Sequence, residues 1–243
     1  GPEIAGSQRS EDLFIFTVKH VTLKKGQRMV IPVQEFTLTY RDVYTLDIPF
    51  TPPPEVWRQL GSNQQREMAR LASRPTVTHK IRLSNKSSFP LTTAPALIIR
   101  DNQVLAQGMM TYTAKGAETD LAITTAVDVG VKKTDKETER VPNAVQWRGD
   151  QYMRVDLAGV LKLTNYRTET IDLEVTRYVL GNVGEADHDG STSMVNMFED
   201  GDYVPDGGTP YWWGWYNWPY WWNHFNGVGK VECKLKLAPG ADK

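Results

Sequence analysis

An alternation of apolar and polar residues with a period of two constrains the fold of this chain most. It is clearest over residues 153–163, where the odd positions are mostly apolar and charged residues lie between them. Successive side chains of a strand point to opposite faces, so this pattern predicts a strand with one buried face. Residues 171–175 and 231–237 alternate in the same way. The apolar positions of the first run are Met153, Val155, Leu157, Leu161 and Leu163.

Further strands and the turns between them follow from shorter apolar runs and from turn-forming pairs such as Asp101-Asn102 and Lys115-Gly116. The charges of alternating sign between Lys132 and Arg140 are expected at a solvated hairpin tip. Many short strands at this spacing predict a mainly β protein, built as an antiparallel β-sandwich. The further strands are expected near residues 13–21, 28–33, 43–49, 77–84, 95–100, 104–113 and 119–132.

One helix is expected within the β pattern, over residues 55–73. It follows the Pro52-Pro53-Pro54 stop and ends at Arg74-Pro75, since a residue before proline is pushed out of helical geometry. Gly61-Ser62-Asn63 should weaken it. The side chains expected to pack on the sandwich are Trp57, Leu60, Met68 and Leu71.

A single β-rich domain is expected over residues 11–243, with the main sandwich over 76–243. Residues 11–50 form either a small subdomain or strands of the same sheets. Gly1-Pro2 is typical of the scar left when a protease removes a tag, and residues 1–10 are expected to be a disordered start.

An aromatic run at residues 211–225 holds six of the 8 tryptophans of the chain. Period-two and helical structures both place neighbouring side chains on different faces, so consecutive rings cannot share one core. Two alternatives stay open: the run packs on itself over the sandwich, or it exposes a stacking platform for a partner or a sugar. The candidate binding residues are Trp212, Trp213, Trp215, Tyr216, Trp218, Tyr220, Trp221 and Trp222.

Composition argues against several classes of protein. The net charge of -1 lacks the basic excess of a nucleic-acid binder. Cys233 is the only cysteine, which leaves no disulfide framework and no thiolate zinc site. No apolar run approaches the roughly 20 residues that span a bilayer.

No arrangement of residues points to catalysis, so neither an enzyme nor a cofactor is expected. The Gly-x-Ser-x-Gly nucleophile elbow is missing from the sequence. An acidic, Gly-rich segment does not match the spacing of a calcium loop and is expected to be a solvated loop. His79 shares the alternation of Ile81 and Leu83, which indicates a half-buried histidine with a partner rather than a metal ligand. The acidic segment contains Glu185, Asp187, His188 and Asp189, and then Glu199, Asp200 and Asp202.

Several segments resemble the C-terminal β domain of mucoidy-inhibitor-A-like bacterial proteins, a domain of unknown function. Ile81–Asn85 followed by Phe89-Pro90-Leu91 is similar to its "strand, Asn, proline-bearing turn, strand" opening. Leu163–Tyr166 followed by Ile171–Arg177 is similar to its second unit of this kind. Lys236–Gly240 is similar to the "aliphatic, Pro-Gly" segment before its last strand.

The resemblance covers roughly two thirds of the chain and implies an envelope-associated or secreted bacterial module without established enzyme activity. We therefore expect a non-catalytic β-sandwich module that mediates protein–protein or cell-surface contacts, with the aromatic loop as contact surface. The alternative is a carbohydrate-binding module that uses the same tryptophans. In the resembled family a further strand follows the Pro-Gly turn, so the strand near 230–237 is expected at an unpaired sheet edge, where self-association is possible.

Overall fold

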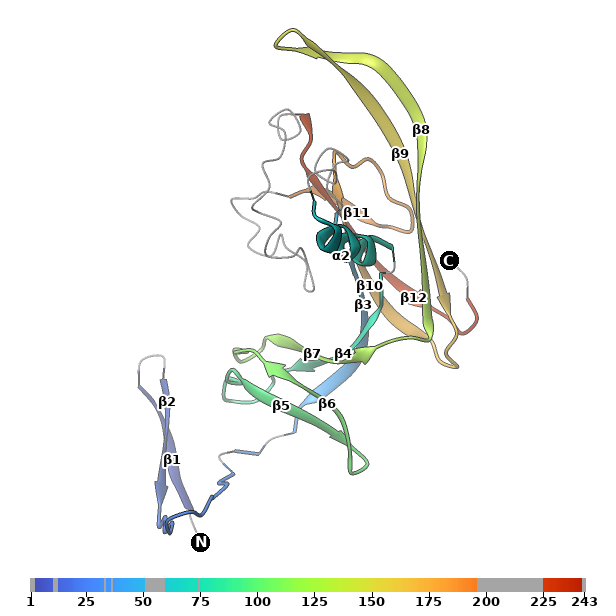
Figure 1. Ribbon diagram of the computed structural model, residues 1–243. Helices are drawn as coiled ribbons and strands as arrows, with labels where there is room; N and C mark the ends of the chain where they lie inside the picture. Colours follow the sequence, from blue (N-terminus) through green and yellow to red (C-terminus); the bar gives the residue numbers. More distant parts are fainter. Residues whose placement is uncertain are drawn as a thin grey trace.

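The computed structural model describes residues 3–10, 13–32, 34–35, 37–50, 60–73, 75–195 and 225–241. This part of the chain is mainly β, which confirms the predicted class (Figure 1). Its strands are β1 (Glu3–Ser10), β2 (Leu13–Lys19), β3 (Thr39–Ile48), β4 (Thr78–Ser84), β5 (Ala94–Arg100), β6 (Gln103–Met110), β7 (Glu118–Thr125), β8 (Val129–Trp147), β9 (Asp150–Asn165), β10 (Ile171–Leu180), β11 (Ser191–Met194) and β12 (Val228–Leu237). Its helix is α2 (Ser62–Ser73).

Six strands form one mixed sheet in the order β11-β12-β10-β3-β4-β7. Every pair in it is antiparallel, as predicted, except β3 and β10, which run parallel. Parallel neighbours need a long connection, and the chain between Ile48 and Ile171 supplies one. The early segment at 39–48 is therefore a central strand of the sheet and not a strand of a separate subdomain.

One face of this sheet forms the hydrophobic core. Leu173 pairs with Tyr44 on β3 and with Leu235 on β12, so the three side chains share that face. The base of the β8–β9 hairpin covers it, since Val129 and Leu163 belong to the same buried cluster. Burial of one such aliphatic side chain contributes about 1.5–3 kcal/mol, so the apolar alternation drives this two-layer packing.

The hairpin of β8 and β9 extends well beyond the sheet (Figure 1). Its tip is the turn at Arg148 and Gly149, where both residues have positive φ angles of 52° and 89°. The prediction of a tip at 132–140 is wrong, because these residues lie within β8. Charges of alternating sign fit there because most of β8 is exposed. The strand expected at 119–132 is divided by a turn between β7 and β8.

Two asparagines, Asn85 and Asn165, organise equivalent turns, and both are fully buried. The side-chain amide of each donates to a carbonyl four residues later, that of Phe89 or of Glu169, at 2.9 Å. The Oδ1 atom of each accepts a backbone N–H two residues later. Asparagine suits these positions because one side chain both donates and accepts.

Helix α2 begins later than expected. Gln65 N donates to Gly61 O, and the Gln64 side chain accepts from Gly61 N, so Gly61 lies at the capping position. Gly61-Ser62-Asn63 therefore contains the start of the described helix, and the earlier part of the predicted helix, over 55–59, lies outside the described residues. Leu60, expected within the helix, lies just before it and is buried. The prediction for Trp57 lies outside the described residues.

The ends of the chain differ from expectation in two ways. Glu3–Ser10, expected to be disordered, form β1 and pair with β2, while residues 28–32 form no strand. β12 is flanked by β11 over Gly229–Glu232 as well as by β10, so the prediction of an unpaired edge is wrong for that half. The strand β11 was not predicted from the sequence, because it is short and follows an acidic loop.

Candidate functional site

The aromatic run predicted as the contact surface, Trp212–Trp222, lies outside the described residues. Phe225, at the end of the run, is described and half-buried. Its ring meets Trp147 edge-on, with 5.8 Å between centroids, and lies 5.2 Å from the ring of Tyr152. The end of the run is therefore attached to the tip of the β8–β9 hairpin.

The acidic segment forms no recognisable cation site in the part that is described. Among the described residues, no group of three or more His, Cys, Asp or Glu side chains is placed to hold a metal ion. His188 and Asp189 have positive φ angles and form a turn. The remaining residues of the acidic segment, Glu199, Asp200 and Asp202, lie outside the described residues.

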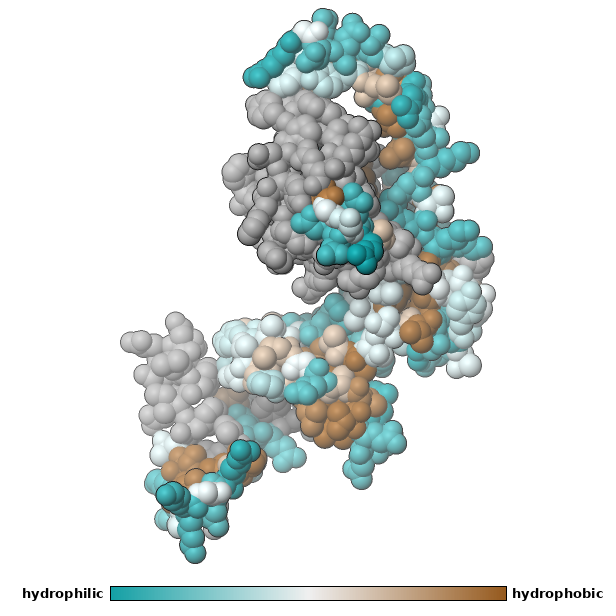
Figure 2. All heavy atoms as spheres, viewed as in Figure 1, coloured by the Kyte–Doolittle hydropathy of each residue, from teal (hydrophilic) through white to brown (hydrophobic). Residues whose placement is uncertain are grey.

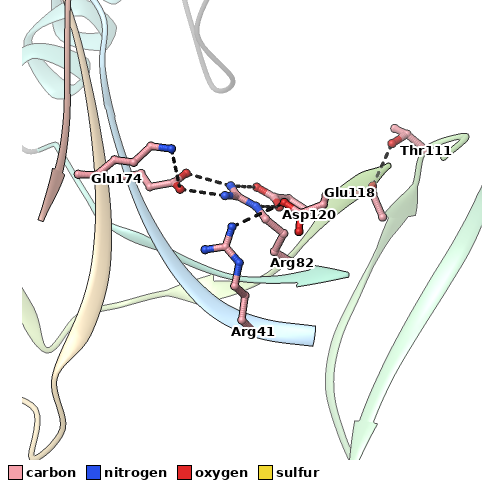
Figure 3. Close-up of polar contacts among 8 residues, drawn as sticks. Arg41, Arg82, Thr111, Glu118, Asp120 and Glu174 are labelled. Carbon is pink, nitrogen blue, oxygen red and sulfur yellow. Dashed lines mark hydrogen bonds and ion pairs between the residues drawn. The ribbon is translucent and has the colours of Figure 1, made fainter. Parts of the chain in front are cut away.

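A polar network crosses the sheet on the face opposite the core (Figure 3). Arg82 on β4 donates to both carboxylate oxygens of Asp120 on β7, at 2.6 and 2.8 Å. It also reaches across β3 to Glu174 on β10, at 2.8 and 2.9 Å. The side chains are only 14%, 28% and 24% exposed, so these charges interact with little solvent screening.

The charges in this network stabilise one another. Hydrogen bonds from Arg82 hold the pKa of Asp120 below its ordinary 3.8 and the pKa of Glu174 below its ordinary 4.5. The same bonds raise the pKa of Arg82 further. A general acid or base needs a pKa near the working pH, and these shifts move all three groups away from it. Arg82 therefore joins three strands of the sheet, β4, β7 and β10, across β3, and its geometry is that of a structural clamp.

His79 has the partner that its alternation predicted. Its Nε2 atom lies 2.8 Å from Asp42 Oδ1, and its ring stacks on Tyr44 with 4.6 Å between centroids. Burial raises the pKa of Tyr44, although the nearby charge of Arg167 opposes the rise. This cross-strand stack links β3 and β4 within the core layer.

An exposed apolar surface lies on the hairpin of β5 and β6, and the sequence prediction missed it. The pairs Ile99–Val104, Leu97–Gln107 and Pro95–Met109 place their side chains on one face. Leu97, Ile99, Val104 and Met109 are 56%, 57%, 64% and 59% exposed. Figure 2 shows apolar residues gathered over this hairpin, next to a polar tip. We name this surface, formed by Pro95, Leu97, Ile99, Val104, Gln107 and Met109, the β5–β6 face.

The other side of the same hairpin is also apolar. Ala96, Ile98 and Ala106 alternate with the exposed residues and are half-buried. A strand that is apolar at both odd and even positions is typically covered on both faces, and this one leaves one face exposed. The run Ala94–Ile99, apolar at every position, was the signal that could have revealed the surface.

A second exposed stripe follows β9. Met153, Val155 and Leu157 are 51%, 40% and 61% exposed and share one face of the strand. Nearer the sheet, the same face buries Leu163 and packs the partly buried Leu161 against the core. The predicted strand is confirmed, but only its last third reaches the core. These three residues are called the β9 stripe below.

Comparisons with protein-family models, with curated proteins and with solved structures found no match. No helix in the described part of the chain has the length and apolar character needed to cross a membrane.

Proposed function

We propose that this protein is a non-catalytic β-sandwich module that mediates protein–protein contacts. The observation that carries the proposal is the β5–β6 face, where Leu97, Ile99, Val104 and Met109 are each more than half exposed side by side. Isolated exposed apolar residues are ordinary, whereas a contiguous face of them is typical of a contact site. The two layers of the proposed sandwich are the mixed sheet and the β8–β9 base, and the supporting observation is that residues of both belong to one buried cluster.

The polar clusters support the proposal that the protein is not catalytic. Arg82, Asp120 and Glu174 satisfy one another, and His79 is paired with Asp42. The resemblance to mucoidy-inhibitor-A-like domains supports a bacterial envelope or secreted location. We propose that the partner is a protein at the cell surface, since the β5–β6 face is apolar and the buried centre of a protein–protein interface is depleted of charged residues.

Site-specific photo-cross-linking tests this function. A photoreactive residue at position 97 should yield a discrete protein adduct in cells that produce the protein. The same residue at position 127 is a matched control, because Val127 is an isolated apolar residue, 82% exposed, in the turn before β8. Equal labelling from both positions, or none from position 97, would rule out the proposed contact surface.

Carbohydrate binding through the tryptophans remains the second candidate, favoured by one observation. Phe225 packs on Trp147 and Tyr152, which joins the end of the run to further rings on the hairpin tip. If the run binds sugars, replacing Trp215, Trp218 and Trp221 by Ala should abolish glycan-array binding and leave the unfolding free energy unchanged. Lost stability with no change in binding would instead show that the rings are structural.

A further inference from the structure

We draw no further inference here: the strongest candidate, the exposed β9 stripe on the β8–β9 hairpin, is an apolar strand face, and nothing in the structure shows what covers it.

Discussion

At the residue scale, the most consequential side chain is Arg82, which uses four hydrogen bonds to hold two carboxylates on strands to either side of it. An arginine can do this because its planar guanidinium presents donors along two edges. The sequence contains a hint, since Arg82 interrupts the apolar residues Ile81 and Leu83. The partners could not be predicted, because Asp120 and Glu174 are distant in sequence and meet only after the sheet order is set.

Replacing Arg82 by Met should lower the unfolding free energy by about 3–5 kcal/mol, because two poorly exposed carboxylates would lose the guanidinium that donates two hydrogen bonds to each of them. Chemical denaturation measures this loss. The matched control is Arg154→Met. The Arg154 side chain forms ion pairs but is 58% exposed, so this substitution should lower the unfolding free energy by less than about 1 kcal/mol. Similar losses in the two variants would contradict the clamp.

Acid should weaken the fold through the same carboxylates. Hydrogen bonds from Arg82 lower the pKa of Asp120 and Glu174 in the folded state, so the unfolded chain binds more protons in acid. Their stabilisation is complete above the ordinary values of 3.8 and 4.5 and is lost as the pH falls through the folded pKa. The unfolding free energy, titrated from neutral pH downward, should fall below about pH 5. R82M should show a shallower fall, and an equal slope would refute the assignment.

At the element scale, the β8–β9 hairpin is fixed to the sheet where Arg177 of β10 passes over Gly159 of β9. Arg177 forms an ion pair with Asp135 of β8 at this point. Burial raises the pKa of Asp135, but hydrogen bonds and charge from Arg177 and Lys133 outweigh it and hold that pKa below 3.8. The contact therefore joins both strands of the hairpin to the sheet.

Gly159→Ala should destabilise the protein by about 1–3 kcal/mol, since the new methyl group would displace the guanidinium from Asp135. Equilibrium unfolding of G159A, of R177M and of the double variant forms a double-mutant cycle, which measures the coupling between the two positions. The glycine substitution should cost much less in the R177M background. An undiminished cost there would mean that backbone strain, not the arginine, is responsible.

The asparagine turns belong to the same scale and are equally testable. Asn85→Asp and Asn165→Asp should each lose at least about 2 kcal/mol, because a carboxylate cannot donate to the buried carbonyls that the amide satisfies. Asn143→Asp, at an exposed position, should change thermal unfolding by less than about 0.5 kcal/mol. A large difference between the first two variants would argue against equivalent turns.

Local signals predicted the elements well. The turns at Asp101-Asn102 and Lys115-Gly116 are present, and β9, β10 and β12 follow the predicted alternation. The error at Lys132–Arg140 has a physical cause. Charge and glycine content indicate exposure or a break, but they do not say whether the break lies inside an element or at its end.

At the scale of the whole molecule, the sheet order and the exposed faces could not be predicted. The parallel pairing of β3 with β10 joins two segments that are separated in the chain by the helix and by six strands, β4 to β9, and no local pattern encodes it. The β5–β6 face was missed for the related reason that an apolar run predicts burial. We propose that this run stays exposed because it contacts a partner.

The stability of L97K/I99K tests the central claim most directly. If Leu97 and Ile99 serve a contact with another chain, their replacement should leave the unfolding free energy of the isolated protein within about 0.5 kcal/mol of wild type. If they are core residues, two buried charges should cost several kcal/mol. Equilibrium denaturation at a dilution where the protein is a single copy decides between these results, and a loss above about 3 kcal/mol would contradict the account.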